Sequence, residues 1–200
     1  MRAVPIDRRT ALAVVAALSL LRPARGFAEN KFTLLSQPKP VPAFALDDQD
    51  GHPFGVARLK GHWTLLFMGY TYCPDICPYT LANLAAVIDA MAKRAPADKV
   101  PQVVFLAVDP TRDKPVLKSY IGSFGDRFIG ITGSLDAIQT LVDGIGGYVR
   151  REPPDNDGQY AVVHTATVSV VDPSARIVAT MLPPFQPAET ADKLIVLMPR

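Results

Sequence analysis

Cysteine is nearly absent from this chain. Two of its 200 residues are cysteines, Cys73 and Cys77, and only three positions separate them. No cysteine follows the apolar run near the N-terminus, which excludes a lipoprotein anchor at that place. Two thiols at this spacing can hold a soft metal ion, form a reversible disulfide, or do both. The pair is therefore the first place to look for a function.

A strong excess of charge of either sign is also lacking. The formal net charge is +2, from 21 basic and 19 acidic residues. Five of the basic residues but only one acidic residue lie in the first 28 positions, so the remainder is slightly acidic. Proteins that bind nucleic acid carry a concentrated basic surface. This balance gives no reason to expect a nucleic-acid partner.

The apolar run at residues 11–21 is short, which favours an export signal over a permanent membrane anchor. As a helix it would span roughly 16 Å at about 1.5 Å per residue, whereas the hydrocarbon core is about 30 Å thick. Arg8 and Arg9 precede the run and small residues follow it, as in an export signal. We expect residues 1–28 to be such a signal, for general or twin-arginine export, with a membrane tether as the alternative.

Export would place the cysteines in an oxidising compartment, and we expect a bacterial periplasm. There an unprotected thiol pair tends to become a disulfide, so a reducing partner would be needed. The composition of the rest, with 48% hydrophobic and 20% charged residues in the whole chain and no repeat, is typical of one globular domain. Prolines at 38, 40 and 42 predict an extended linker over residues 29–42, followed by a domain at 43–200.

The order of apolar runs predicts alternating strands and helices. Nearly continuous runs at 63–70 and 103–108 are typical of strands buried on both faces, and helical spacing follows each of them. A further strand at 128–131 precedes a helix that we expect Ser134 to cap. This rhythm favours a parallel sheet with helices on its faces.

Antiparallel elements are predicted at both ends of the domain. Residues 44–54 read as a hairpin around Asp50 and Gly51, which suit a turn with positive φ. Residues 160–171 and 176–181 read as a second hairpin, with a surface loop at 150–158 before it and a final helix at 187–198 after it. The sequence thus predicts an α/β, thioredoxin-like three-layer fold, with a central mixed sheet, helices on both faces and an additional N-terminal β-hairpin.

The two cysteines fall where the first long strand passes into the first long helix. The free N–H groups and the dipole of a helix start favour negative charge, so we expect lowered thiol pKa values. On a regular helix, Cβ atoms four residues apart lie about 5–6 Å from each other, whereas a relaxed disulfide needs about 3.8 Å. A bridging metal is therefore favoured, and a frayed first turn leaves a reversible disulfide open. The alternative is a structural disulfide or two inert buried thiols.

Two thiolates leave a metal ion under-coordinated, so a third ligand is expected among the three histidines. His52 and His62 lie beside turns and read as exposed. His164 lies in a predicted strand, where strand parity places it on the apolar face with Val162. A histidine packed in the core is the alternative. Two thiolates and one imidazole suit copper, and with an open position they would also accept zinc.

Three blocks of sequence resemble the SCO/SenC family of copper-binding, thioredoxin-like proteins that help assemble cytochrome c oxidase. They are the cysteine block at 69–78, the Asp-Pro block at 108–113, and the histidine strand at 163–166 with 172–173. The resemblance runs from about residue 42 to the C-terminus. It implies copper ligands at Cys73, Cys77 and His164.

The family usually has an acidic residue just before the ligand histidine, and this chain has Val163 there. Strand parity points Val163 away from the ligand face, so we expect coordination to survive and a polar contact to a partner or to the backbone to be absent. Asp75 and Asp109 are candidates to shape the charge or docking of the site, with helix-start and turn roles as the alternative.

The leading functional hypothesis is a copper metallochaperone, which is not a turnover enzyme. It would pass copper, as Cu(I) or Cu(II), to the binuclear copper site in a subunit of cytochrome c oxidase. The alternative is a thiol-disulfide reductase, in which Cys73 and Cys77 are a redox-active pair that keeps the cysteines of that copper site reduced. A peroxidase-like thiol enzyme is a third possibility. We expect a monomer, served by a periplasmic thiol reductant and by another copper chaperone.

Overall fold

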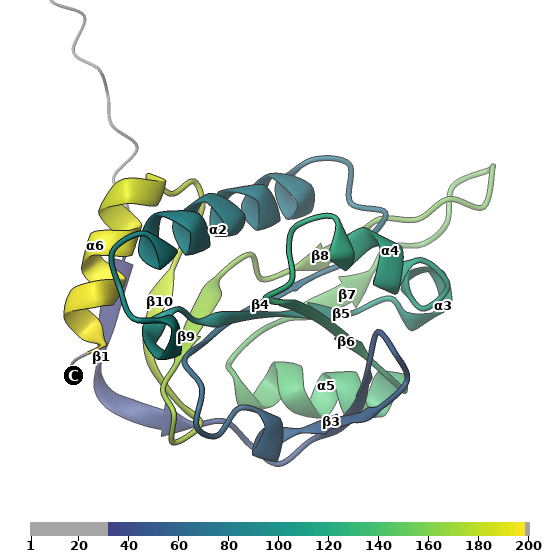
Figure 1. Cartoon of the computed structure of the whole chain (residues 1–200). Helices are drawn as coiled ribbons and strands as arrows, with labels where there is room; N and C mark the ends of the chain where they lie inside the picture. Colours follow the sequence, from purple (N-terminus) through teal and green to yellow (C-terminus); the bar gives the residue numbers. More distant parts are fainter. Residues whose placement is uncertain (1–31, 199–200) are drawn as a thin grey trace, which may run out of the picture.

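The computed structural model describes residues 32–198 (Figure 1). One mixed sheet has the strand order β1-β10-β9-β4-β5-β6-β2-β3, and β7 and β8 form a separate pair. The strands are β1 (Phe32–Pro40), β2 (Ala45–Asp48), β3 (Pro53–Gly55), β4 (Thr64–Gly69), β5 (Gln102–Ala107), β6 (Phe128–Thr132), β7 (Val149–Arg151), β8 (Val162–His164), β9 (Val168–Val171) and β10 (Arg176–Met181).

The helices cover both faces of the large sheet. They are α2 (Ile76–Ala92), α3 (Pro110–Asp113), α4 (Leu117–Gly122), α5 (Leu135–Gly144) and α6 (Pro187–Leu197), with short 3₁₀ turns at Val56–Arg58 and Ala97–Lys99. In Figure 1, α2 and α6 lie on one side of the sheet and α5 lies on the other. The predicted three-layer α/β fold with a central mixed sheet is confirmed.

The apolar runs at residues 63–70 and 103–108 form the central strands β4 and β5 of the sheet. Strand β4 pairs parallel with β5, and β5 pairs parallel with β6. All six residues of β4 are buried, because α2 and α5 cover the two faces of the sheet. The helix cap predicted at Ser134 is present, with its hydroxyl accepting a hydrogen bond from the backbone N–H of Ala137.

The predicted N-terminal hairpin is also present, as β2 and β3. Gly51 has a φ of +80° in the turn, as that turn requires. The hairpin is part of the main sheet, because β2 pairs with the edge of β6. The export signal predicted at residues 1–28 lies outside the described residues.

Two expectations differ from the structure. Residues 32–40 are extended, as expected for a linker, but they form β1, which pairs with β10 at the edge of the sheet. An edge strand tolerates the prolines at 38 and 40, since its outer N–H groups need no partner. The strand expected over 160–171 is interrupted: β8 pairs with β7, whereas β9 pairs with β4 and β10.

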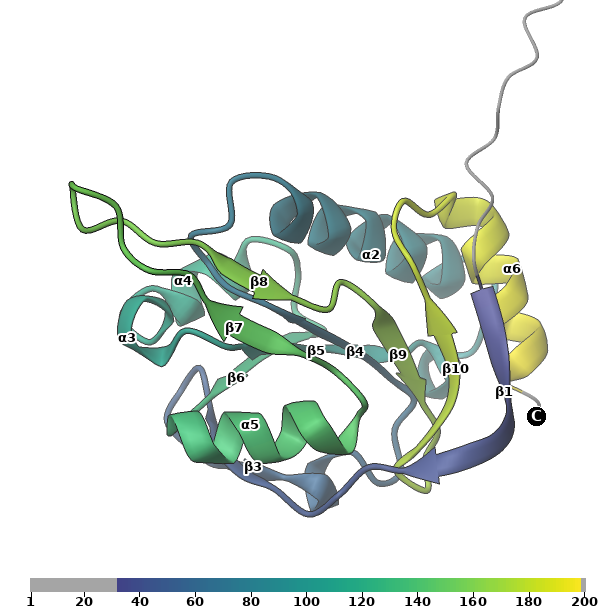
Figure 2. The same ribbon diagram turned by 180° about the vertical axis from the view of Figure 1, so that it is seen from behind.

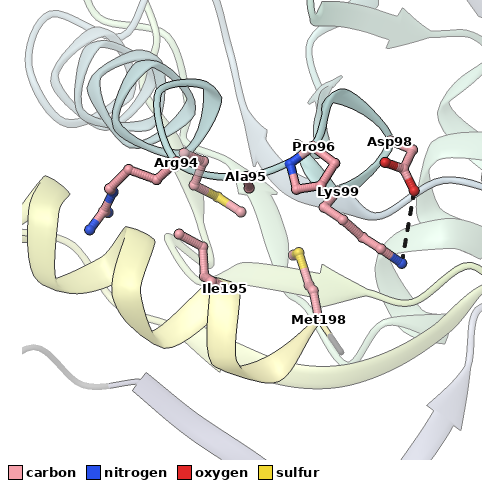
Figure 3. Close-up of a pocket in the computed structure, with 8 residues that line it drawn as sticks. Arg94, Ala95, Pro96, Asp98, Lys99, Ile195 and Met198 are labelled. Carbon is pink, nitrogen blue, oxygen red and sulfur yellow. Dashed lines mark ion pairs between the residues drawn. The ribbon is translucent and has the colours of Figure 1, made fainter. Parts of the chain in front are cut away.

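The C-terminal end of α2 packs against α6 and leaves a cavity of about 610 Å³ (Figure 3). Met198 of the C-terminal segment and Ile195 of α6 line it together with Pro96 in the loop after α2. Met91 of α2 also lines this cavity and lies 14 residues after Cys77, which is about 21 Å along the helix at about 1.5 Å per residue. Among residues 32–198, no helix is long and apolar enough to cross a lipid bilayer.

Candidate metal centre

The two cysteines lie on different local structures. Cys73 is in the loop between β4 and α2, where its N–H donates to the carbonyl of Tyr70 at 3.2 Å. Cys77 is the second residue of α2, which begins at Ile76. Both are free thiols, and both are buried. The distance between two positions of a regular helix therefore does not apply to this pair, since only Cys77 is helical.

The sulfur of Cys77 lies beneath the end of β4. A Cβ atom placed on Gly69 would come within 2.8 Å of the Cys77 Sγ and equally close to the ring of Phe105. Only glycine leaves this space free, because real Cβ atoms do not approach a sulfur atom so closely. The glycine before the cysteine block thus allows the thiol to be fully buried.

The expected lowering of the thiol pKa is wrong for Cys77. Burial raises the pKa of the Cys77 thiol well above its ordinary value, and the neighbouring Cys73 contributes in the same direction. The side chain points back into the core, so the loss of solvation outweighs the effect of the helix start. Burial therefore favours the neutral thiol of Cys77, and a bound cation would favour the thiolate.

His164 reaches Cys77 from a distant part of the chain. It is the last residue of β8, and its Nε2 atom lies 3.5 Å from the Cys77 Sγ. Its Nδ1 atom lies 3.1 Å from the backbone carbonyl oxygen of Thr165. A carbonyl oxygen only accepts hydrogen bonds, so this contact assigns the proton to Nδ1 and leaves the lone pair of Nε2 facing the sulfur.

The ring of His164 is packed among aromatic side chains and is only partly exposed. Its edge contacts are with Tyr70 and Phe67, at ring-centre distances of 5.9 and 6.4 Å. Burial lowers the pKa of His164, which keeps the ring neutral at pH 7. A neutral imidazole beside a buried thiol is suited to bind a soft cation. The parity prediction also holds, because Val162 is buried and Val163 is 44% exposed.

The ligand atoms of Cys73, Cys77 and His164 are not all close enough to one another to bind one ion in this structure. Cys77 and His164 are in contact, but the three ligand atoms do not all lie within 4.8 Å of one another. Binding one ion with all three therefore requires the loop of Cys73 or the hairpin of His164 to move. Soft sulfur and imidazole donors match Cu(I), and the same set accepts zinc.

A more compact acidic group has another explanation. Within the described part of the chain, Asp48, Asp50 and His52 are the group whose ligand atoms all lie within 4.8 Å. The Asp48 carboxylate accepts hydrogen bonds from the backbone N–H groups of Asp50 and His52, at 3.0 and 2.9 Å. This is the usual way in which an aspartate holds a turn. His52 and His62 are exposed, as predicted.

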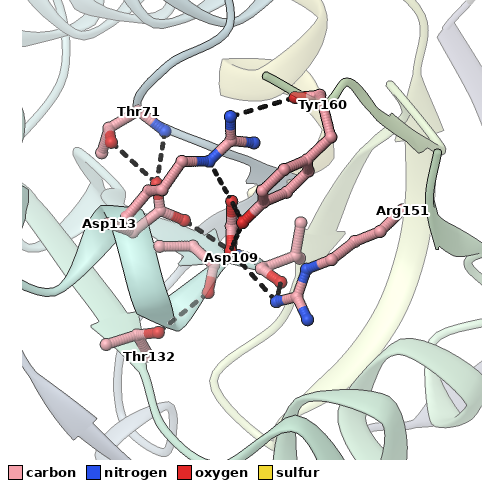
Figure 4. A network of polar contacts seen from close by, with 9 residues as sticks. Thr71, Asp109, Asp113, Thr132, Arg151 and Tyr160 are labelled. Carbon is pink, nitrogen blue, oxygen red and sulfur yellow. Dashed lines mark hydrogen bonds and ion pairs between the residues drawn. The ribbon is translucent and has the colours of Figure 1, made fainter. Parts of the chain in front are cut away.

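A buried polar network lies beside the cysteine loop, residues 70–75, and the sequence reasoning named only Asp109 among its members. Asp109 and Asp113 are fully buried, and hydrogen bonds link them to Thr71, Arg112, Arg151 and Tyr160 (Figure 4). Burial raises the pKa of the Asp113 carboxyl, against the effect of the hydrogen bonds it accepts. Two acids four positions apart after a buried strand were the available signal. Their partners lie up to 51 residues away and leave no local pattern.

Known proteins resemble both the sequence and the fold. The SCO2-like protein of Rickettsia prowazekii is 37% identical over 135 residues, which are 66% of this chain and 64% of that relative. The structure of Bradyrhizobium japonicum ScoI with copper bound is 34% identical, with a TM-score of 0.70 over 78% of this chain and 97% of that one. Yeast Sco1 with copper bound is 28% identical, with a TM-score of 0.73 over 80% and 88% of the two chains.

The family match covers most of the domain. The family model described as SCO1/SenC matches residues 34–198, from β1 to the end of α6. This span contains the cysteine loop, the buried acidic network and the strand that carries His164. On this match and these similarities, the chain belongs to the SCO1/SenC family.

Proposed function

We propose that this protein is a copper metallochaperone that binds copper through Cys73, Cys77 and His164. It delivers the metal to the binuclear copper site of cytochrome c oxidase during assembly. The observation that carries the proposal is the 3.5 Å contact between the Cys77 sulfur and the unprotonated Nε2 of His164. Support also comes from two similar proteins, ScoI and yeast Sco1, whose structures contain copper.

The chemistry follows from the donor atoms. Both thiols lose a proton when their sulfur atoms bind Cu(I), while the imidazole donates the lone pair of Nε2 without losing a proton. Copper then leaves by ligand exchange, as thiolates of the acceptor replace those of this chain one at a time. The three-coordinate set leaves room for an incoming sulfur atom, so no free ion is released into solution.

Copper titration tests the ligand set. The reduced wild-type protein should bind about one copper per chain, and His164→Ala should bind it at least about tenfold more weakly, since one of three ligands is lost. His52→Ala is the matched control, because His52 is exposed and lies in the β2–β3 turn. Equal affinity in wild type and His164→Ala, with unchanged melting temperatures, would contradict the three-ligand site.

A thiol-disulfide reductase is the second candidate, and the free thiols of Cys73 and Cys77 favour it. One thiolate would attack a disulfide of the partner, and the second would then displace the partner from the mixed disulfide. The partner gains two electrons, and this chain is left with a Cys73–Cys77 disulfide. Rapid reduction of a disulfide-bonded peptide by the copper-free protein, abolished by loading with copper, would favour this candidate over delivery.

The partners and the location belong to the same proposal. The copper-site subunit of the oxidase is the acceptor, and another copper chaperone supplies the metal. A thiol reductant is required because the export pattern at residues 1–28 directs the protein to the periplasm, where a thiol pair is exposed to oxidation. Fractionation of cells into periplasm and cytoplasm tests the location, and recovery of the full-length chain in the cytoplasm would contradict it.

A further inference from the structure

The strand that carries His164 is not a strand of the main sheet. Among residues 32–198, strands β7 and β8 pair only with each other; they are the two green arrows in Figure 2. An isolated two-stranded hairpin is only marginally stable in water. No ladder hydrogen bond joins this hairpin directly to the described strands of the main sheet, and three residues connect His164 to β9, which pairs with β4. Side-chain contacts therefore contribute to setting the distance between His164 and Cys77.

One side of the buried network holds the cysteine loop. The N–H and the hydroxyl of Thr71 both donate to the Oδ1 atom of Asp113 at 2.7 Å. The backbone N–H of Asp109 donates to the other carboxylate oxygen of Asp113 at 2.9 Å. Since Thr71 lies two residues before Cys73, this carboxylate ties the loop to the end of β5.

The other side of the network holds the hairpin. The Asp109 carboxylate accepts hydrogen bonds from the Tyr160 hydroxyl at 2.9 Å and from the Arg151 guanidinium at 3.1 Å. Arg151 ends β7, and Tyr160 lies two residues before β8. Figure 4 shows Asp109 and Asp113 between Thr71 on one side and Tyr160 and Arg151 on the other.

Arg112 contacts both sides at once. Its Nε atom donates to the Asp109 carboxylate, and its Nη1 atom donates to the carbonyl oxygen of Tyr160 at 3.0 Å. Its guanidinium carbon lies 3.7 Å from the ring centre of Tyr160, and 5.4 and 5.7 Å from those of Tyr72 and Tyr70 in the cysteine loop. A planar guanidinium can stack and donate in this way, whereas an ammonium group cannot.

We infer that Arg112 is a positioning residue that holds the hairpin of His164 against the cysteine loop and so sets the geometry of the metal site. The inference deepens the proposed function, since it names the residue that assembles its ligands. Arg112 touches no ligand atom itself. It acts through Tyr160, which leads into β8, and through Tyr70, whose ring contacts His164.

The test compares Arg112→Lys and Arg112→Gln with Arg176→Gln, a control substitution in a similar ion pair elsewhere in the chain. Arg176 binds the buried Asp172 through two N–H groups, at 2.9 and 2.7 Å, in the turn between β9 and β10. Arg176→Gln therefore removes a similar pair remote from the network. Three quantities are measured on each protein: melting temperature, copper affinity with the copper spectrum, and amide hydrogen exchange of the metal-free chain at residues 71 and 160–164.

Loss of support around a metal site typically weakens metal binding by about 10- to 100-fold. We expect a loss of this size in both Arg112 variants, a shifted copper spectrum and faster exchange at residues 71 and 160–164. Arg176→Gln should lower the melting temperature and leave the other two readouts unchanged. Lysine should not rescue, because it keeps the charge but not the stacking plane.

The outcomes separate this inference from the proposed function. If Arg112→Lys and Arg112→Gln match Arg176→Gln in exchange, copper affinity and spectrum, the positioning role is wrong. If the wild type binds no copper, the proposed function fails, and the exchange of the metal-free chain still decides whether Arg112 holds the hairpin. Full rescue by lysine, with loss in Arg112→Gln, would support the positioning role and assign it to the charge of Arg112 rather than to its stacking plane.

Discussion

The sulfur of Cys77 and the Nε2 atom of His164 lie 3.5 Å apart, although 87 residues separate them in the chain. Cys77 reaches this position from the first turn of α2, and His164 from the end of a hairpin outside the main sheet. The contact joins a thiol that burial keeps protonated to an imidazole that burial keeps neutral. A soft cation can replace the thiol proton and bind both groups.

Adding a methyl group at Gly69 should disturb the site. In Gly69→Ala the new Cβ would lie 2.8 Å from both the Cys77 Sγ and the Phe105 ring, so we expect destabilisation by about 1–3 kcal/mol and weaker copper binding. Urea unfolding and copper titration measure the two effects. Gly122→Ala is the control, because it meets nothing within 4 Å and should be neutral or slightly stabilising in α4. Equal behaviour of the two variants would show that Cys77 does not need this space.

Thiol alkylation should depend steeply on pH. The pKa of Cys77 is raised by burial, so less thiolate is present at any given pH, and the rate should rise about tenfold per pH unit beyond pH 9. The measurement uses Cys73→Ser, which leaves Cys77 as the single thiol, in the folded and in the urea-unfolded state. The unfolded protein should react faster at pH 7. A folded rate that levels off below pH 8 would mean that the helix start dominates after all.

Replacing Val163 by aspartate should leave the metal site intact. The side chain of Val163 is exposed, so Val163→Asp should change the free energy of unfolding by less than about 0.5 kcal/mol and copper affinity by less than about twofold. Any gain should be confined to binding of an oxidase copper-site subunit, measured by calorimetry. Val162→Asp is the contrast, since it buries a charge and should unfold the hairpin. A large change in copper affinity in Val163→Asp would show that this side chain does affect the ligands.

Strand β1 should contribute to stability. A chain that begins at residue 42 lacks Phe32 and Leu35, which pack partly buried against the core, and leaves the edge of β10 unpaired. Compared with a chain that begins at residue 32, its free energy of unfolding in urea should be lower by about 2 kcal/mol or more. Equal stability of the two chains would mean that residues 32–41 serve only as a linker.

Much of the fold could be predicted because it depends on residues that are close to one another in the sequence. The runs that form β4 and β5 are apolar on both faces, the cap at Ser134 is a local hydrogen bond, and the turn at Gly51 needs a positive φ. Pairing partners are not local. The prolines of β1 predicted an extended segment correctly, but only the free edge of β10 decided that this segment joins the sheet.

The strand predicted over residues 160–171 also shows that local patterns do not reveal pairing partners. Alternation placed Val162 inward and Val163 outward, as the structure has them. The pattern continued into β9 without a break, so nothing local showed that the chain leaves β7 and enters the main sheet after His164. That change of partner depends on Val149 pairing with His164 and on β4 pairing with β9.

The sequence alone determined which residues are candidate ligands, since two cysteines and three histidines leave few choices and alternation separates His164 from the others. It also determined the helix start beside the thiols. Only the tertiary structure decided their properties: the fold buries Cys77 beneath Gly69, which reverses the expected direction of its pKa, and Arg112 joins two segments that meet only after folding. Solvation and long-range contact depend on how the layers pack, and no short stretch of sequence contains that information.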